Sequence, residues 1–335
     1  MNTFPFPSDF LDDKCILVTG GTGSFGRKFV ETVLNRYKPK RLVIYSRDEM
    51  KHYEMAQVFS PAEYPCLRYF IGDIRDLQRL RMALRGIDYV VHAAALKHVP
   101  AAEYNPFECI ATNVIGAENL VSACLTEGVK RVVALSTDKA ANPINLYGAS
   151  KLAADKIFVA ANNLAGKDDT RFSSVRYGNV IGSRGSVIPF FKSLVAKGAS
   201  ELPITDERMT RFWITLDQGV DFVLSSLSTM HGAEIFVPKI PSMRIIDLAK
   251  AIAPDLPLKN TGIRPGEKLH EVMISEDDAR HTIDVGDHYV IEPDFTTWER
   301  EPMAGTAVPE GFSYVSNTND HWLQAEDLKK VVKDL

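Results

Sequence analysis

The 335-residue sequence has few cysteines and no long apolar run. Its four cysteines are scattered, with no CxxC pair and no histidine-rich neighbour, which argues against a disulfide framework and a structural metal. No segment approaches about 18 uninterrupted apolar residues, and the N-terminus lacks a basic start followed by an apolar run, so neither a membrane span nor a signal peptide is expected. These absences favour a reduced, cytoplasmic globular protein.

The sequence also lacks an excess of either charge. Lysine and arginine total 39 against 43 aspartates and glutamates, a formal net charge of −4. A balance this close gives no electrostatic reason to expect a nucleic acid or a membrane surface as partner. We therefore expect a small-molecule substrate.

Short apolar runs rich in β-branched residues alternate with helical patterns through the first half of the chain. The predicted strands are residues 15–19, 41–46, 67–71, 89–93, 131–136 and 173–177. The predicted helices between them are residues 25–37, 77–84, 107–126 and 147–162. Such alternation is typical of parallel strands joined by right-handed crossovers, so the sequence predicts an α/β fold with a doubly wound, Rossmann-type sheet.

The alternation breaks after about Gly182, where proline and glycine divide the chain into shorter pieces. We expect residues 1–180 to form the nucleotide-binding domain. We expect residues 181–335 to form mostly a smaller, substrate-binding lobe, from which some strands or helices can return to the first domain.

A glycine-rich turn follows the first predicted strand directly. Gly20, Gly23 and Gly26 have the spacing of a dinucleotide-binding turn, in which a helix N-terminus faces the pyrophosphate. The alternative is an ordinary tight strand-to-helix turn, but the position near the N-terminus favours a cofactor. The predicted contacts are Gly20, Thr22, Gly23, Ser24, Phe25 and Gly26.

The end of the second predicted strand bears on the choice between NAD and NADP. An acidic residue there commonly binds the ribose of NAD, whereas an arginine accommodates the 2′-phosphate of NADP. Ser46 and Arg47 occupy this place and Lys51 follows one helical turn later, which favours NADP. The alternative is a solvated, charged helix start. The predicted contacts are Ser46, Arg47, Asp48, Glu49, Met50 and Lys51.

Two further strand ends supply candidate contacts. Asp73 and Ile74, after the third strand, are predicted near the adenine, with an ordinary helix cap as the alternative. Ala93 lets a ribose pass close to the backbone after the fourth strand, and Lys97 could meet the cofactor or a substrate phosphate. Asn113 either supports the active-site lysine through water or is a satisfied buried amide.

The candidate catalytic residues lie in two neighbouring segments. Asp138 can give a proton and Lys139 can take one, directly after the fifth predicted strand. Tyr147 and Lys151 are four residues apart, so they share one helix face, and a neighbouring ammonium stabilises a tyrosinate. The alternative for Asp138 and Lys139 is a surface ion pair. Acid, base and redox pair together suit a reaction that oxidises, eliminates and reduces in one site.

These motifs resemble the extended short-chain dehydrogenase/reductase superfamily, and more closely its UDP-N-acetylglucosamine 4,6-dehydratases of the inverting, pseudaminic-acid-pathway type. The stretches that carry the resemblance are LVTGGTGSFG, YSRDEMKHYEM, HAAALKHVPAAEYNP, LSTDKAANPINLYGASK, VRYGNVIGSRGSVIPFF, MTRFWIT and IRPGEKLHEVMIS. The resemblance implies bound NADP, UDP-N-acetylglucosamine as substrate and a homo-oligomer, commonly a hexamer. Retaining sugar-nucleotide dehydratases typically carry Thr-Asp-Glu where this chain has Thr137-Asp138-Lys139.

The resemblance also implies roles for these residues. Tyr147 removes the C4 hydroxyl proton, Lys139 takes the C5 proton, and Asp138 protonates the departing C6 hydroxyl. The roles require a raised pKa for Asp138 and a lowered pKa for Lys139. The predicted substrate contacts are Lys97, Asn179, Ser183, Arg184, Gly185, Ser186, Val187, Ile188, Thr205, Arg264 and Glu267; for Thr205 and Glu267 a structural role is equally open.

Three readings stay open at the level of sequence. The first is NADP-dependent dehydration with inversion at C5. A retaining dehydratase or a sugar 4-epimerase could use the same Tyr147/Lys151 pair, although an epimerase has no evident need for Asp138 and Lys139. A nucleotide-sugar-binding or redox-sensing scaffold without turnover is the alternative outside the enzyme class.

Overall fold

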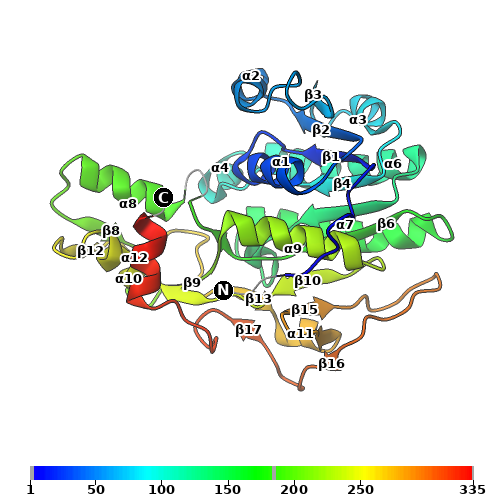
Figure 1. Cartoon of the computed structure of the whole chain (residues 1–335). Helices are drawn as coiled ribbons and strands as arrows, with labels where there is room; N and C mark the ends of the chain where they lie inside the picture. The colour runs from blue at the N-terminus through cyan, green and yellow to red at the C-terminus, as the bar shows by residue number, and fades with distance from the viewer. Residues whose placement is uncertain (1–3, 183–185, 334–335) are drawn as a thin grey trace.

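The structure is a computed structural model, and it describes residues 4–182 and 186–333. Ten strands form the main sheet, in the order β16-β14-β15-β10-β6-β5-β4-β1-β2-β3 (Figure 1). The strands from β3 to β10 run parallel, and β15, β14 and β16 are added antiparallel at one edge. Their bounds are β1 Cys15–Thr19, β2 Arg41–Ser46, β3 Leu67–Ile71, β4 Tyr89–His92, β5 Arg131–Leu135, β6 Arg171–Val175, β10 Ile235–Pro238, β14 Thr282–Asp284, β15 His288–Ile291 and β16 Thr306–Ala307. The predicted doubly wound α/β fold is confirmed.

Helices cover both faces of this sheet. One face carries α1 Ser24–Arg36, α2 Glu49–Val58 and α9 Leu216–Thr229; α1 and α9 pack together on the near side in Figure 1. The other face carries α3 Leu77–Leu84, α6 Gly116–Glu127 and α7 Leu146–Ala165. The short helical segments are α4 Val99–Tyr104, α5 Pro106–Ile110, η1 Ala111–Ile115, η2 Asp138–Ala140 and α11 Glu276–Ala279.

The alternation of side chains along each strand divides the core into two layers. Ile16 and Val18 of β1 join the apolar cluster under α1 and α9, whereas Leu17 joins the cluster under α3, α6 and α7. All three side chains are fully buried, because a central parallel strand is covered on both faces. This two-sided burial explains why the predicted strands are continuous apolar runs.

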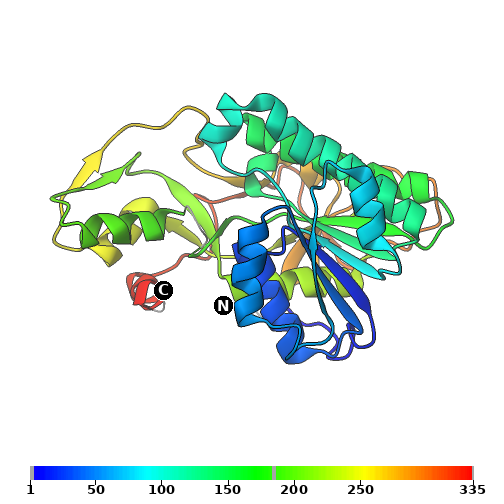
Figure 2. The ribbon, with the colours of Figure 1, turned by 90° about the horizontal axis from the view of Figure 1, so that it is seen from above.

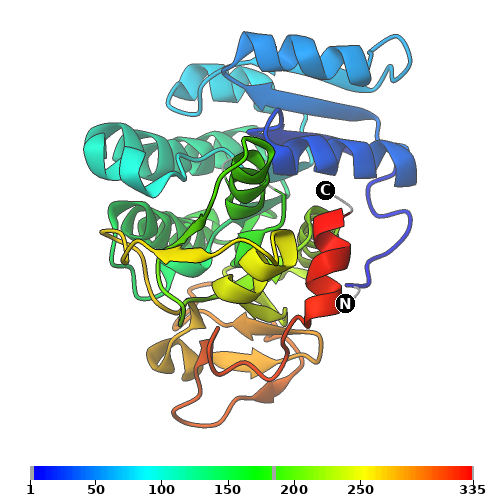
Figure 3. The same cartoon turned by 90° about the vertical axis from the view of Figure 1, so that its left-hand side faces the viewer.

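A smaller lobe stands to one side of the sheet (Figures 1 and 2). It has its own apolar core, which includes Phe191, Trp213 and Leu248. Two small sheets belong to this region, β11-β9-β7 and β12-β8, whereas the β13-β17 pair packs its buried side chains into the core of the main sheet. Helix α12 lies beside α10, as Figure 3 shows. The bounds are β7 Asn179–Val180, α8 Val187–Ala196, β8 Leu202–Ile204, β9 Thr210–Ile214, β11 Ser242–Arg244, α10 Ile245–Ile252, β12 Leu258–Asn260, β13 Val272–Ile274, β17 Tyr314–Val315 and α12 Ala325–Lys333.

The chain after residue 181 also returns to the main sheet. Strands β10, β14, β15 and β16 all come from this part, and β10 pairs in parallel with β6. The guanidinium of Arg176, just after β6, is fully buried and lies between the carboxylates of Asp155 on α7 and Asp278 on α11, at 3.6 and 3.1 Å. This buried ionic contact fastens the C-terminal segments to the edge of the sheet where β6 ends.

One helical run, Pro106–Glu127, is long and apolar enough to cross a membrane by length and composition alone, with a mean hydropathy of 1.2. Half of that apolar window is buried inside the protein, where α6 packs against α3 and α7. Its middle turn, η1, is π-helical rather than the continuous α-helix that the sequence predicts. Asn113 lies in this turn, and π-bulges of this kind frequently mark functional sites.

Candidate active site

The glycine-rich turn after β1 fits a dinucleotide phosphate. Gly20 has a positive φ of 64°, and a Cβ there would lie 2.8 Å from the backbone nitrogen of Ala94. A Cβ on Gly26 would lie 2.4 Å from the backbone of Gly21, so only glycine allows α1 to start this close to the sheet. Gly23 caps α1 without a side-chain hydrogen bond, which leaves the helix N-terminus open to an anion. The chain therefore builds the cradle that a dinucleotide needs.

The end of β2 is polar and carries two exposed cations, Arg47 and Lys51. Ser46 hydrogen-bonds Thr22 of the glycine-rich turn, Oγ to Oγ1, at 2.9 Å. Asp48 caps α2 by accepting from the backbone nitrogen of Lys51, and it also pairs with the Lys51 amine at 2.8 Å. Because Asp48 engages the Lys51 amine, Arg47 is the cation left at the strand end, 3.7 Å from Asp73.

The ends of β3 and β4 are held by local contacts. Asp73 pairs with Arg75 at 2.8 Å, whereas Ile74 is buried in the apolar core. Asn113 accepts from the nitrogen of Leu96 and donates to its carbonyl, both at 2.8 Å, so the loop that runs from Ala93 to Lys97 is clamped to the π-helical turn. Asn113 is thus a satisfied buried amide, one of the two alternatives that the sequence leaves open.

A cleft of about 440 Å³ runs along this loop, between Arg47 and Lys97. Its floor includes the backbone and small side chains of Ala95 and Ala101. Partial burial and the nearby charge of Lys139 lower the pKa of Lys97. The cleft therefore runs from the end of β2 to Lys97, whose charge in turn interacts with that of Lys139.

Asp138 and Lys139 form the short turn η2 after β5, and they are not a surface pair. Asp138 is fully buried, and its Oδ1 accepts from Thr137 Oγ1 at 2.9 Å and from Lys139 Nζ at 3.0 Å. Its other oxygen, Oδ2, has no hydrogen-bond partner. Burial raises the pKa of Asp138, the charge of Glu271 raises it further, and Lys139 opposes both. The raised pKa expected for Asp138 is confirmed.

The expected lowering of the Lys139 pKa is wrong. Burial acts to lower it, but two carboxylates lie 3.0 Å from the Lys139 amine, on Asp138 and on Glu271, and they raise the pKa above its ordinary value. Lys139 is therefore a cation in this state of the protein. The sequence analysis missed Glu271, because nothing in its local pattern distinguishes it from an ordinary surface glutamate ahead of a strand.

Tyr147 and Lys151 reach the same place from the first turns of α7. Asn145 caps this helix by accepting from the nitrogen of Gly148 at 2.7 Å. Tyr147 is almost fully buried; burial raises its pKa to about 12, against the opposing effects of Lys139 and of a hydrogen bond with Thr137. Burial lowers the pKa of Lys151. The geometry brings together all four candidate catalytic residues, on η2 and on the start of α7.

The predicted substrate contacts are distributed over the lobe. Asn179 lies in β7, and its buried Oδ1 has no hydrogen-bond partner. Ser186 caps α8, Val187 begins it, and Ile188 is buried in the lobe core. Ser183, Arg184 and Gly185 lie outside the described residues.

The remaining predicted contacts lie on two lobe loops. Thr205 donates to the sulfur of Met209, and the exposed Arg264 lies 3.7 Å from Glu267. The second loop reaches the catalytic turn, because the carbonyl of Gly266 accepts from the Asn145 side chain at 2.7 Å. This contact places Glu267, whose Oε2 is buried without a partner, next to the start of α7.

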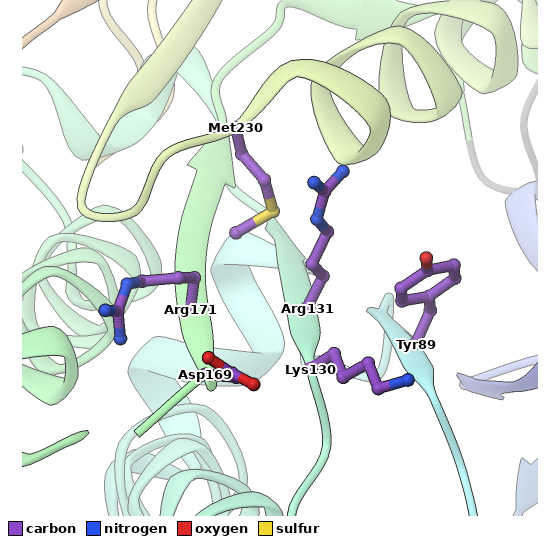
Figure 4. A pocket seen from close by; sticks show the side chains of 6 residues that line it. All are labelled: Tyr89, Lys130, Arg131, Asp169, Arg171 and Met230. Atoms are coloured by element: carbon purple, nitrogen blue, oxygen red, sulfur yellow. The ribbon is translucent and has the colours of Figure 1, made fainter. Parts of the chain in front are cut away.

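Another cleft, of about 370 Å³, opens at the amino ends of β4, β5 and β6 (Figure 4). Its lining residues are Tyr89, Lys130, Arg131, Asp169, Arg171 and Met230. Arg131 already donates to the carbonyls of Leu227 and Ser228 at the end of α9. Arg171 donates to backbone carbonyls of its own loop. Because ligands of open α/β sheets bind at the carboxyl ends of the strands, we assign the site to the opposite edge.

A family model described as polysaccharide biosynthesis protein matches residues 16–293. The chain belongs to this family. It is 57% identical to the inverting UDP-N-acetylglucosamine 4,6-dehydratase of Campylobacter jejuni, over 96% of this chain and 98% of the relative. It is also 43% identical to a UDP-glucose 4-epimerase of Rickettsia akari, over 96% of each chain. The resemblance to UDP-N-acetylglucosamine 4,6-dehydratases is confirmed.

Solved structures of other proteins have the same fold. The X-ray structure of Pen from Bacillus thuringiensis matches with a TM-score of 0.88 and 34% identity, over 97% of this chain and all of that one. DesIV of Streptomyces venezuelae, a dTDP-glucose 4,6-dehydratase with NAD bound, matches with a TM-score of 0.67 and 25% identity, over 76% of this chain and 86% of that one. A nicotinamide cofactor is consistent with this second match.

The contact between α7 and η2 gives a first prediction. A Cβ on Gly148 would lie 2.2 Å from the carbonyl oxygen of Lys139, so Gly148→Ala must push α7 away from the catalytic turn. We expect a loss of about 1–3 kcal/mol in the free energy of unfolding, measured with urea. Gly219→Ala is the matched control, because nothing lies within 4 Å of that helical position, and it should be neutral or stabilising. Equal effects of the two substitutions would contradict the tight contact.

Proposed function

We propose that the protein is an NADP-dependent UDP-N-acetylglucosamine 4,6-dehydratase that inverts C5, a carbon–oxygen lyase. The observation that carries the proposal is the buried pair of Asp138 and Lys139 beside Tyr147, at the carboxyl edge of the sheet. Identity of 57% to an enzyme of that name, over nearly the whole of both chains, supports the same activity.

The chemistry divides among four side chains. Tyr147, with Lys151 on the same helix face, accepts the proton of the C4 hydroxyl. Passage of one proton from the Lys139 ammonium to the Asp138 carboxylate would ready both groups. Lys139 then takes the proton at C5, which the C4 ketone makes acidic, and Asp138 protonates the departing C6 hydroxyl. A proton from solvent reaches C5 from the opposite face and completes the inverted sugar. A nicotinamide dinucleotide held at the glycine-rich turn would supply the redox chemistry, by taking a hydride from C4 and returning it at C6. Asp138 is suited to donate, because burial holds its pKa above the usual carboxyl range.

The cofactor proposed is NADP. Asp48, the first carboxylate after β2, is engaged, because it caps α2 and pairs with Lys51. Arg47 remains as the cation that can meet a 2′-phosphate. The glycine-rich turn at Gly20 and Gly26 would hold the pyrophosphate, and Ser46 lies beside this turn.

Two alternatives within the enzyme class share most of this site. The epimerase named among the relatives would need Tyr147 and Lys151, but it gives no role to a buried acid at Asp138 or to the amine of Lys139. A retaining dehydratase would use the same acid, and the resemblance associates it with glutamate where this chain has Lys139. A binding or redox-sensing scaffold without turnover needs none of the proton-handling side chains of Asp138, Lys139 and Tyr147.

The remaining parts of the proposal concern product and assembly. We propose UDP-2-acetamido-2,6-dideoxy-β-L-arabino-hex-4-ulose as product, the first step of pseudaminic acid biosynthesis, and a lobe after residue 181 that holds the UDP group. A homo-oligomer, with a hexamer as the expected form, is supported by large apolar side chains exposed along α4 to α7, which would be covered by another copy. They are Tyr104, Phe107, Ile110, Ile115 and Leu164. The cytoplasmic location stays a prediction.

Turnover itself tests the dehydratase. UDP-N-acetylglucosamine should lose one water without net accumulation of reduced cofactor, since the hydride taken from C4 returns to C6. Tyr147→Phe should abolish the first oxidation, whereas Asp138→Asn should permit it and slow loss of the C6 hydroxyl by about 10²-fold or more. Mass spectrometry follows the water, and absorbance follows the bound nicotinamide. Stoichiometric growth of the reduced-cofactor band would indicate a simple dehydrogenase instead.

Arg47→Asp tests the cofactor. The substitution removes the cation proposed to meet the 2′-phosphate, so NADP affinity should fall by about tenfold to hundredfold, and NAD affinity much less. Isothermal titration with each cofactor measures both affinities. Arg85→Asp makes the same charge change in the loop before β4, away from the glycine-rich turn, and should leave both affinities unchanged. Wild-type protein that binds NAD and NADP equally would refute this assignment.

A further inference from the structure

Glu271 is a buried charge at the candidate active site, and the reaction scheme gives it no role. It lies directly before β13 and is 1% exposed. Its backbone nitrogen donates to the hydroxyl of Ser316, and its carbonyl accepts from the nitrogen of Ser316, both at 2.9 Å. Two cations face its carboxylate, Lys139 at 3.0 Å and Arg211 of β9 at 3.5 Å. Backbone hydrogen bonds and two cations therefore hold a buried carboxylate at this place, although it comes from a segment remote in sequence.

Burial acts to raise the pKa of Glu271, but Lys139 and Arg211 outweigh it and lower that pKa. Burial raises the pKa of Asp138, the other carboxylate on Lys139. The pKa values of the two carboxyl groups that flank the Lys139 ammonium are therefore shifted in opposite directions, so Asp138 takes up a proton more readily than Glu271 does. The elimination requires a protonated Asp138 and a neutral Lys139, which the passage of one proton from Lys139 to Asp138 would supply.

We propose that Glu271 is a positioning residue for the elimination, whose buried carboxylate holds the amine of Lys139 beside Asp138. The inference rests on the proposed dehydratase function. Glu271 acts through its two neighbours, because Lys139 and Arg211 occupy its Oε1 side and its Oε2 has no partner among the described residues.

The charged and titratable groups that face Lys139 belong to several elements. They are Asp138 on its own turn, Glu271 before β13, Arg211 on β9, Lys97 after β4, Tyr147 on α7 and Lys268 on the lobe loop. Lys268 is anchored by donating to the carbonyl of Ala141 at 2.5 Å. Of the two carboxyl groups in this set, only Glu271 is not the proposed acid, so its charge can be removed without removing a group that meets the sugar.

Glu271→Gln tests the proposal through the pH dependence of elimination. Loss of one adjacent negative charge lowers the pKa of Lys139 and of Asp138 together. The rise and the fall of the rate profile, which report the coupled titration of Asp138 and Lys139, should therefore both move to lower pH, by about 1–3 units. The measurement is release of the C6 hydroxyl and exchange of the C5 hydrogen in heavy water, as a function of pH. Oxidation at C4, followed by absorbance in a single turnover, should keep its wild-type pH dependence.

Glu234→Gln is the matched control. Glu234 is also fully buried and pairs with an arginine, Arg300, at 2.8 Å, so Glu234→Gln removes a buried, paired charge without changing the charge beside Lys139. Its elimination profile should match the wild type. If Glu271→Gln does not fold, Glu271→Asp tests the proposal, because it keeps the charge but moves the carboxylate away from Lys139. Elimination should then slow at least about tenfold, with an unshifted pH profile.

The outcomes separate the two levels of the account. Wild-type protein that releases no water from UDP-N-acetylglucosamine at any pH would refute the proposed function itself. Wild-type turnover together with a Glu271→Gln profile that does not shift would refute the role of Glu271 alone, as would a Glu271→Asp variant with wild-type elimination.

Discussion

The candidate site depends on one ammonium group held between two buried carboxylates. The Lys139 amine lies 3.0 Å from Asp138 on its own turn and 3.0 Å from Glu271, which belongs to the far C-terminal part of the chain. Removing these charges from water is costly, so each must be paired with good geometry. Because β13 packs against η2, the proton-handling turn is complete only when the C-terminal segment has docked.

The same dependence explains why the chain is not two independent domains. Strands β10, β14, β15 and β16 extend the sheet that β1 to β6 begin, and Arg176 ties α7 to α11 through two carboxylates. The lobe loop at Gly266 bonds Asn145 at the start of α7. Substrate held by the lobe would therefore meet a catalytic turn whose geometry the lobe itself helps to set, which suits an enzyme that must exclude water during elimination.

The doubly wound sheet, the glycine-rich turn and the meeting of Asp138 with Tyr147 could all be predicted, because they follow from local periodicity and from the rule that ligands bind at the carboxyl ends of parallel strands. The direction in which the pKa of Lys139 is shifted could not be predicted from the sequence. It depends on Glu271, which is distant in sequence and reaches the site only through tertiary packing. The helix cap by Asp48 could be predicted from its residue type. Its ion pair with Lys51, which leaves Arg47 with only the longer contact to Asp73, is visible only in the folded structure.

Inversion at C5 is the central claim, and the configuration of the first product tests it most directly. Protein, NADP and UDP-N-acetylglucosamine are combined in heavy water, and proton NMR follows the 4-keto sugar from the earliest detectable time. The account predicts deuterium at C5 and the L-arabino configuration, with no such product from Lys139→Met, which should stop after oxidation at C4. A product that has the D-xylo configuration from the outset would contradict inversion.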